Sequence, residues 1–188
     1  MNTKTFGAVL GVLIITTACL AFMSTMSSFT SAANVTEQNT SSDANVSYYV
    51  AIGMSTELMN GIHFGNVEPD STENNASQNF NASSMTEYWI AVSPDGNTAV
   101  NISIKDNAVL TSSLDTIPNT GYYYNASETN DGDNPFVAST AMTTSYVQAI
   151  ADVSNGTNAY FRFWLDVPAS TAAGNYNNTV FFQAIKAV

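Results

Sequence analysis

The chain has 188 residues, of which only 10% are charged, and its 15 acidic against 4 basic residues give a net charge of −11. So few Lys and Arg exclude a surface that binds the phosphates of nucleic acid or of anionic membranes. One Cys and one His exclude an intrachain disulfide framework and a Cys-based zinc site, and they argue against a catalytic triad. The length suits one domain, and the missing charge is replaced by 22 Asn, 21 Ser and 22 Thr residues.

The N-terminus begins with a single positive charge, Lys4, followed by 18 uncharged, mostly apolar residues at 6–23 and then a small, polar stretch. This is the order of the n-, h- and c-regions of a secretory signal, with a cleavage site before Asn34. A retained membrane helix is the alternative, because a span needs about 20 apolar residues. We therefore expect an apolar helix, as signal peptide or membrane anchor, over 1–33. In both versions the rest of the chain is exported to the cell surface, and contact with a membrane is confined to 6–23.

Asparagine is concentrated in acceptor motifs for N-linked glycans, Asn-x-Ser/Thr. Nine occur, about twice the number that composition alone gives for so short a motif. Glycans would coat the mature surface where charge normally keeps a protein soluble, although composition by itself remains the alternative explanation. The nine acceptors are Asn34, Asn39, Asn45, Asn75, Asn81, Asn101, Asn125, Asn155 and Asn177.

The exported chain opens with a polar, flexible lead segment at 34–45, which has almost no apolar residue. From residue 46 the dominant period is two, which is typical of strands. The first predicted strand, 46–53, places Tyr48, Val50 and Ile52 on one face.

The middle of the chain predicts a short strand at 61–67 and an Asn- and Ser-rich loop at 68–84, with a piece of strand near Phe80. Two alternating strands follow, at 86–93 and 98–105. The Asp-Gly between them predicts that they form a hairpin. The second strand points Val100, Ile102 and Ile104 to one side and the Asn101 sequon to the other.

Four more strands are expected, at 121–124, 145–151, 160–167 and 179–186. No stretch after residue 34 has a convincing helical period. Eight or nine short strands separated by turns predict an all-β, immunoglobulin-like β-sandwich over 46–188. In strand 160–167 the apolar face carries Phe161, Phe163, Leu165 and Val167, and the opposite face carries Tyr160, Arg162, Trp164 and Asp166.

The C-terminal stretch 160–184, with Pro168, Gly174 and Tyr176 at its corner, resembles the last hairpin of immunoglobulin-like surface proteins of archaea and bacteria. Residues 62–69 and the Tyr-Trp-Ile-Ala-Val run at 88–92 resemble the same archaeal secreted group. In function, the chain resembles archaeal extracellular filament subunits of the thread and bundling-pilus type, which are related in architecture to the TasA–camelysin biofilm fibres. Such a likeness is more specific for fold than for function.

The resemblance implies a structural, homopolymeric subunit whose N-terminal strand completes the sandwich of the next copy. The donor would lie within 34–53 and would carry Tyr48, Val50 and Ile52. Strand addition of this kind is physically sound, because an edge missing a strand exposes backbone groups and apolar pockets. An intramolecular first strand would use the same residues. The alternative function is a monomeric, membrane-anchored binding or adhesion module at the cell surface.

No motif in the chain indicates an enzyme, and we assign no catalytic residue. His63 has no second His or Cys beside it in the exported chain and is expected to be an ordinary strand histidine. Glu128, Asp131 and Asp133 cluster oxygen ligands around a glycine. They make calcium the one candidate cofactor, with a solvated turn as the alternative. Trp89 and Trp164 could stack on sugars or serve as core and interface residues.

Overall fold

The computed structural model describes residues 41, 43–81, 85–130 and 138–188. The predicted signal or anchor therefore lies outside the described residues, as does most of the lead segment. Residues 46–188 form one compact unit, and the unit before it, 1–45, is described only at residues 41 and 43–45, which are exposed and without regular structure. No helix among the described residues has the length and apolarity needed to cross a membrane.

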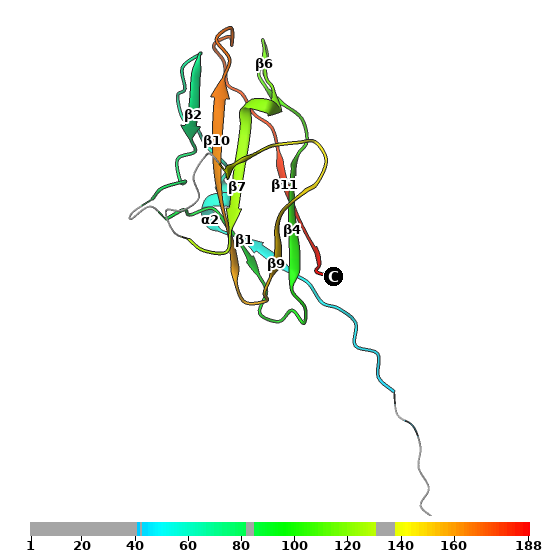
Figure 1. The fold of residues 1–188 in the computed structure, drawn as a ribbon. Coiled ribbons are helices and arrows are strands. Elements are labelled where there is room, and N and C mark those ends of the chain that lie inside the picture. The colour runs from blue at the N-terminus through cyan, green and yellow to red at the C-terminus, as the bar shows by residue number, and fades with distance from the viewer. Residues whose placement is uncertain (1–40, 42, 82–84, 131–137) are drawn as a thin grey trace, which may run out of the picture. The chain divides into compact units, whose positions relative to one another are not determined.

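The fold is all-β, as predicted, and its strands form antiparallel sheets. The larger sheet has the order β1-β3-β10-β7-β8, and β2 pairs with the far end of β10 on the same side as β3. Figure 1 shows β10 between β2 and β7. Its strands are β1 (Ile52–Met54), β2 (Ser71–Asn75), β3 (Trp89–Val92), β7 (Tyr122–Ser127), β8 (Thr140–Ala141) and β10 (Asn158–Val167).

A second sheet of three strands has the order β11-β4-β9, with β4 (Val100–Asp106) between β9 (Val147–Val153) and β11 (Val180–Lys186). The two sheets share one core. Phe161 of β10 packs edge-on against Phe182 of β11, with ring centroids 5.1 Å apart. The predicted apolar faces of β4 and β10 are confirmed, because Val100, Ile102, Ile104 and the four apolar residues of β10 are all buried.

The connections between strands differ from the prediction. β3 and β4 belong to different sheets, so 93–99 carries the chain from one sheet to the other and the predicted Asp-Gly hairpin is wrong. The same holds for β10 and β11, which do not form a hairpin. Asp-Gly fixes a tight reversal locally, but the burial of both strands' apolar faces decides where each strand pairs.

Several short elements were also missed. Residues 61–67 form no strand, whereas Ser71–Asn75, within the predicted loop, pairs with β10 as β2. A one-turn helix, α2 (Thr56–Asn60), is capped by Ser55, whose Oγ accepts a hydrogen bond from the backbone of Leu58. The two-residue strands β5 (Leu110–Thr111) and β6 (Thr116–Ile117), together with β8, raise the described strands to eleven, and a 3₁₀ turn, η1 (Asn119–Gly121), precedes β7.

The outer face of β10 is covered as well as its inner face. Arg162 and Trp164 are buried, although they lie on the face opposite the apolar residues of the strand. The segment after β2 lies over them: Arg162 Nε donates to the carbonyl oxygen of Asn79, and the guanidinium lies 4.9 Å from the Phe80 ring centroid. Asn79 in turn accepts from the Phe163 backbone N–H at 2.8 Å. This cover was not predictable from periodicity, because its residues are mostly Asn and Ser.

One carboxylate, Asp106, is buried at the end of β4. Its Oδ1 accepts from Asn119 Nδ2 at 3.0 Å, and its Oδ2 and the Asn119 Oδ1 have no hydrogen-bond partner among the described residues. Burial raises the pKa of Asp106 above its usual range. The folded state therefore holds this proton more tightly than the unfolded state does.

This arrangement predicts a specific pH dependence. The stability that Asp106 contributes is complete below its unfolded pKa and is lost as the pH rises through the folded pKa. Asp106→Asn removes that loss and supplies a donor for Asn119 Oδ1. The variant should therefore lose less Tm than the native chain between about pH 4 and pH 8. Asp95→Asn, in an exposed turn, is the control, and parallel Tm profiles for all three proteins would contradict the assignment.

Candidate functional site

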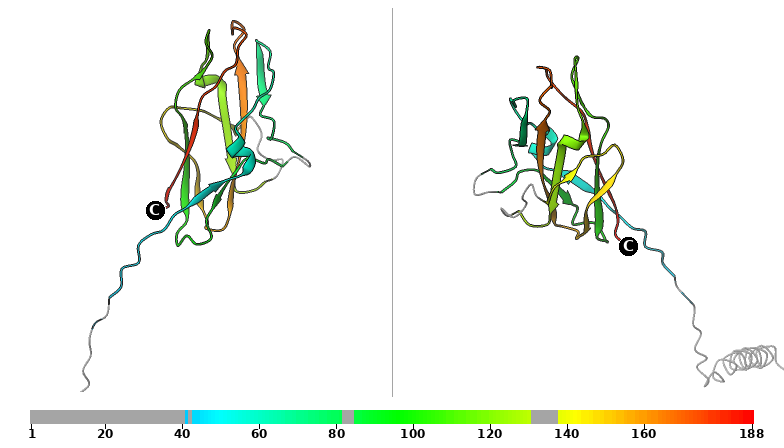
Figure 2. Two further views of the ribbon diagram at one scale, coloured as in Figure 1. Left: turned by 180° about the vertical axis from the view of Figure 1, so that it is seen from behind. Right: turned by 45° about the horizontal axis from the view of Figure 1, so that its top comes forward.

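The most distinctive surface feature is the edge of the smaller sheet formed by β11. In the described part of the chain, β4 is the one strand that pairs with β11, along all seven residues from Val180 to Lys186. Figure 2 follows β11, in red, down to the C-terminus. As far as the structure describes the chain, the other side of β11 is an open strand edge, which is a template for another extended chain.

The register identifies which backbone groups are available at this edge. The ladder with β4 is flanked by hydrogen bonds from Asn107 N–H to the Thr179 carbonyl and from Ala187 N–H to the Ala99 carbonyl. In an antiparallel pair such bonded positions alternate. Odd-numbered residues of β11 therefore bond to β4, and the N–H and C=O groups of Val180, Phe182, Ala184 and Lys186 point away from it.

The same residues leave part of the core uncovered. Val180, Phe182 and Ala184 pack against the core but stay partly exposed. The residues opposite them on β4, Asp106, Ile104 and Ile102, are at most 1% exposed. Residues that combine outward backbone groups with half-covered apolar side chains are what a further strand along β11 would satisfy.

An extended, apolar segment leads into β1 beside the far end of this edge. Val46, Tyr48 and Tyr49 are 75%, 65% and 53% exposed. The segment is attached by polar contacts: Tyr49 N–H donates to Asn97 Oδ1 at 3.0 Å, and Asn97 Nδ2 donates to the Ser47 carbonyl at 3.0 Å.

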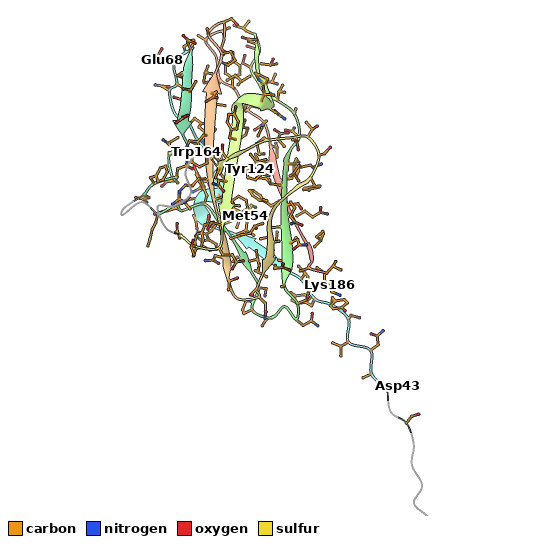
Figure 3. The ribbon with its side chains drawn as sticks, viewed as in Figure 1. Asp43, Met54, Glu68, Tyr124, Trp164 and Lys186 are labelled. Carbon is orange, nitrogen blue, oxygen red and sulfur yellow. The ribbon has the colours of Figure 1, made fainter. Side chains whose placement is uncertain are left out.

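Tyr48 also contacts β11 itself. Lys186 Nζ lies 3.6 Å from the Tyr48 ring centroid, and Figure 3 shows Lys186 where the extended segment enters the domain. A hydrogen bond from Lys186, together with its positive charge, lowers the pKa of the Tyr48 hydroxyl. Because both groups are on the surface, this contact is a weak attachment.

The three residues assigned to strand donation occupy different environments. Tyr48 is exposed, Val50 is partly packed against the core, and Ile52 belongs to β1, where it pairs with Val92 of its own chain. The structure of the single chain thus uses Ile52 internally and leaves Tyr48 on the surface.

The seven sequon asparagines among the described residues lie at the surface. Asn45, Asn75, Asn81, Asn155 and Asn177 are exposed, and Asn101 and Asn125 are partly exposed. Asn101 uses its Oδ1 to accept from the Asp152 backbone N–H. Asn34 and Asn39 lie outside the described residues.

Only one of the three predicted calcium ligands is among the described residues. Glu128 is exposed, whereas Asp131 and Asp133 lie outside the described residues. No cluster of three or more His, Cys, Asp or Glu side chains suited to a metal is found among the residues described. His63 Nε2 is within 3.1 Å of the Asn60 carbonyl oxygen and is exposed. The calcium site stays a prediction.

Comparison with known proteins adds no family to these observations: no protein-family model matches the chain, and no curated protein does.

The open edge makes a prediction for the isolated chain. Amide hydrogens of Phe182 and Ala184 should exchange on the order of a hundredfold faster than those of Phe181, Gln183 and Ile185, which bond to β4. Hydrogen exchange followed by NMR measures this directly. Equal protection of odd and even positions would show that the edge is covered.

Proposed function

We propose that the chain is an exported, glycosylated structural subunit with an immunoglobulin-like β-sandwich fold. It polymerises into an extracellular filament on the cell surface. Each subunit donates its N-terminal segment to the β11 edge of the next copy. The proposal assigns no catalysis and no required cofactor.

The observation that carries this proposal is the edge of β11, where outward backbone groups coincide with half-covered core residues. A donated strand would supply hydrogen bonds to Val180, Phe182 and Ala184 and would cover their side chains. A head-to-tail contact of this kind does not close on itself, and it therefore generates a fibre.

The length of the N-terminal segment fits the role. A donor facing the seven residues of β11 must span about 23 Å. If the chain is cleaved before Asn34, the 16 residues 34–49 precede Val50 and can extend over about 50 Å. They can thus leave one subunit and still run along the edge of another.

The segment is also chemically suited to an edge. Tyr48 is available in the chain as it stands, whereas donating Val50 and Ile52 as well would require β1 to leave β3. Residues 34–50 contain two acidic residues and no basic residue. The segment therefore brings few charges to the edge, and its many Asn, Ser and Thr side chains provide neutral hydrogen-bonding groups.

Microscopy and N-terminal sequencing of protein released from cell surfaces test the proposal. Fibres whose subunits begin at or near Asn34 would support it. Discrete particles that begin at Met1 and need detergent for release would overturn it. They would favour the alternative, a monomeric anchored binding or adhesion module.

A proline at the edge separates assembly from folding. Ala184→Pro removes an N–H that faces away from β4 and has no partner strand among the described residues. We expect filaments to be lost while the monomer's Tm changes by only about 5 °C or less. Ala184→Ser keeps the N–H and should still assemble. Normal filaments from Ala184→Pro in electron micrographs would place the acceptor elsewhere.

Aspartate substitutions at two positions of the N-terminal segment should have different effects on assembly and on stability. Tyr48→Asp places a charge on an exposed donor residue, so it should block assembly with little effect on the monomer's stability. Ile52→Asp buries a charge partly in β1 and should destabilise the monomer by about 2 kcal/mol. Denaturation midpoints and sedimentation measure the two effects. Assembly of Tyr48→Asp at the native level would remove Tyr48 from the donor.

A further inference from the structure

A second surface feature lies on the other sheet and plays no part in strand donation. It is a cleft of about 520 Å³ beside the start of α2, where β3 pairs with β10. Its volume lies in the range of about 300–1,000 Å³ that is typical of small-ligand sites.

The lining of the cleft includes two aromatic side chains on neighbouring strands. Trp89 of β3 and Tyr160 of β10 both line it and are directly opposite each other in the antiparallel register. Directly opposed residues project from the same face of a sheet, with Cβ atoms about 5 Å apart. Their neighbours Ile90 and Phe161 are fully buried on the inner face. Both rings are partly exposed, so the cleft offers an aromatic platform to a ligand.

The lining also includes polar side chains that hydrogen-bond to neighbouring residues. Asn130 accepts from the Thr86 N–H at 2.7 Å and donates to the Thr86 carbonyl at 2.9 Å. Asn81 donates to the Glu87 carboxylate, and Asn158 Nδ2 lies 3.4 Å from the Tyr160 hydroxyl. Side chains fixed in this way lose little conformational entropy when a ligand binds.

The charge of the cleft restricts the ligand. Glu57 and Glu87 line it, and its described lining contains no Lys or Arg. Phosphates, sulfates and uronic acids would be repelled by these carboxylates. Sugar hydroxyls both donate and accept hydrogen bonds, which suits walls made of amides and carboxylates. The apolar C–H face of a sugar ring suits the exposed aromatic platform.

We propose that this cleft binds a neutral carbohydrate, with one sugar ring stacked on Trp89 and Tyr160 and its hydroxyls bonded to Glu57, Glu87 and Asn158. The site does not depend on polymerisation. A filament would display it once per subunit, and a monomeric surface module would use it alone.

Calorimetric titration of the full chain with cellotriose, triacetylchitotriose and trigalacturonic acid tests the proposal. At least one of the two neutral trisaccharides should bind, and trigalacturonic acid should bind at least about tenfold more weakly. Failure of both neutral sugars to bind at about 10 mM, or preferential binding of trigalacturonic acid, would overturn it.

Variants then locate the binding. Trp89→Ala and Tyr160→Ala should each weaken binding at least about tenfold, and Trp89→Phe, which keeps an aromatic ring, should stay within about threefold of the native chain. Tyr146→Ala, at an exposed tyrosine outside the cleft, is the matched control and should bind normally. Thermal unfolding checks that each variant folds. Native affinity in folded Trp89→Ala and Tyr160→Ala would place the sugar elsewhere.

Discussion

The arrangement of the sheets and of the segment that covers them depends most on β10, which is buried on both faces. Its inner face supplies Phe161, Phe163 and Leu165 to the core, while Arg162 and Trp164 on its outer face are covered as well. It pairs with β7 along one side and with both β3 and β2 along the other. A buried guanidinium is costly unless it is hydrogen-bonded. The position of the covering segment at Asn79 is therefore fixed by Arg162 as much as by apolar packing.

As a result, the two sheets differ in how fully their residues are covered. The larger sheet is anchored around one long central strand, and its outer face is partly protected by the segment after β2. The smaller sheet has three strands, and the inner residues of β11 are only partly covered. The contrast between Ile102 and Ile104, which are essentially inaccessible, and Phe182, which is not, marks where the core ends before it is fully enclosed. A protein that remained monomeric would have to tolerate that edge, whereas a polymer can use it.

Alternation along single strands was predictable, because the burial of every second side chain is a local property of the sequence. The faces of β4 and β10 follow from it. The pairing of those strands was not predictable in the same way: Asp95-Gly96 resembles a hairpin turn, but the chain there crosses between sheets. The open edge of β11 is also invisible in the sequence, because it is defined by the lack of a second partner strand among the described residues. The cleft depends on Trp89 and Tyr160 being opposed across 71 residues of sequence. Sequence analysis could name Trp89 as a candidate for sugar stacking but could not supply its partner.

The rarity of positive charge has a practical consequence for anyone who handles the protein. Trypsin cuts after Lys or Arg, and the chain has four such residues, Lys4, Lys105, Arg162 and Lys186. The last three all lie within strands, where the backbone is held in a ladder, and Arg162 is also buried. Digestion therefore needs prior unfolding, and even complete cleavage leaves fragments such as 106–162, too large for routine peptide mass spectrometry. Proteomics based on trypsin would under-count this protein, and a protease that cuts at aromatic or acidic residues is the better choice.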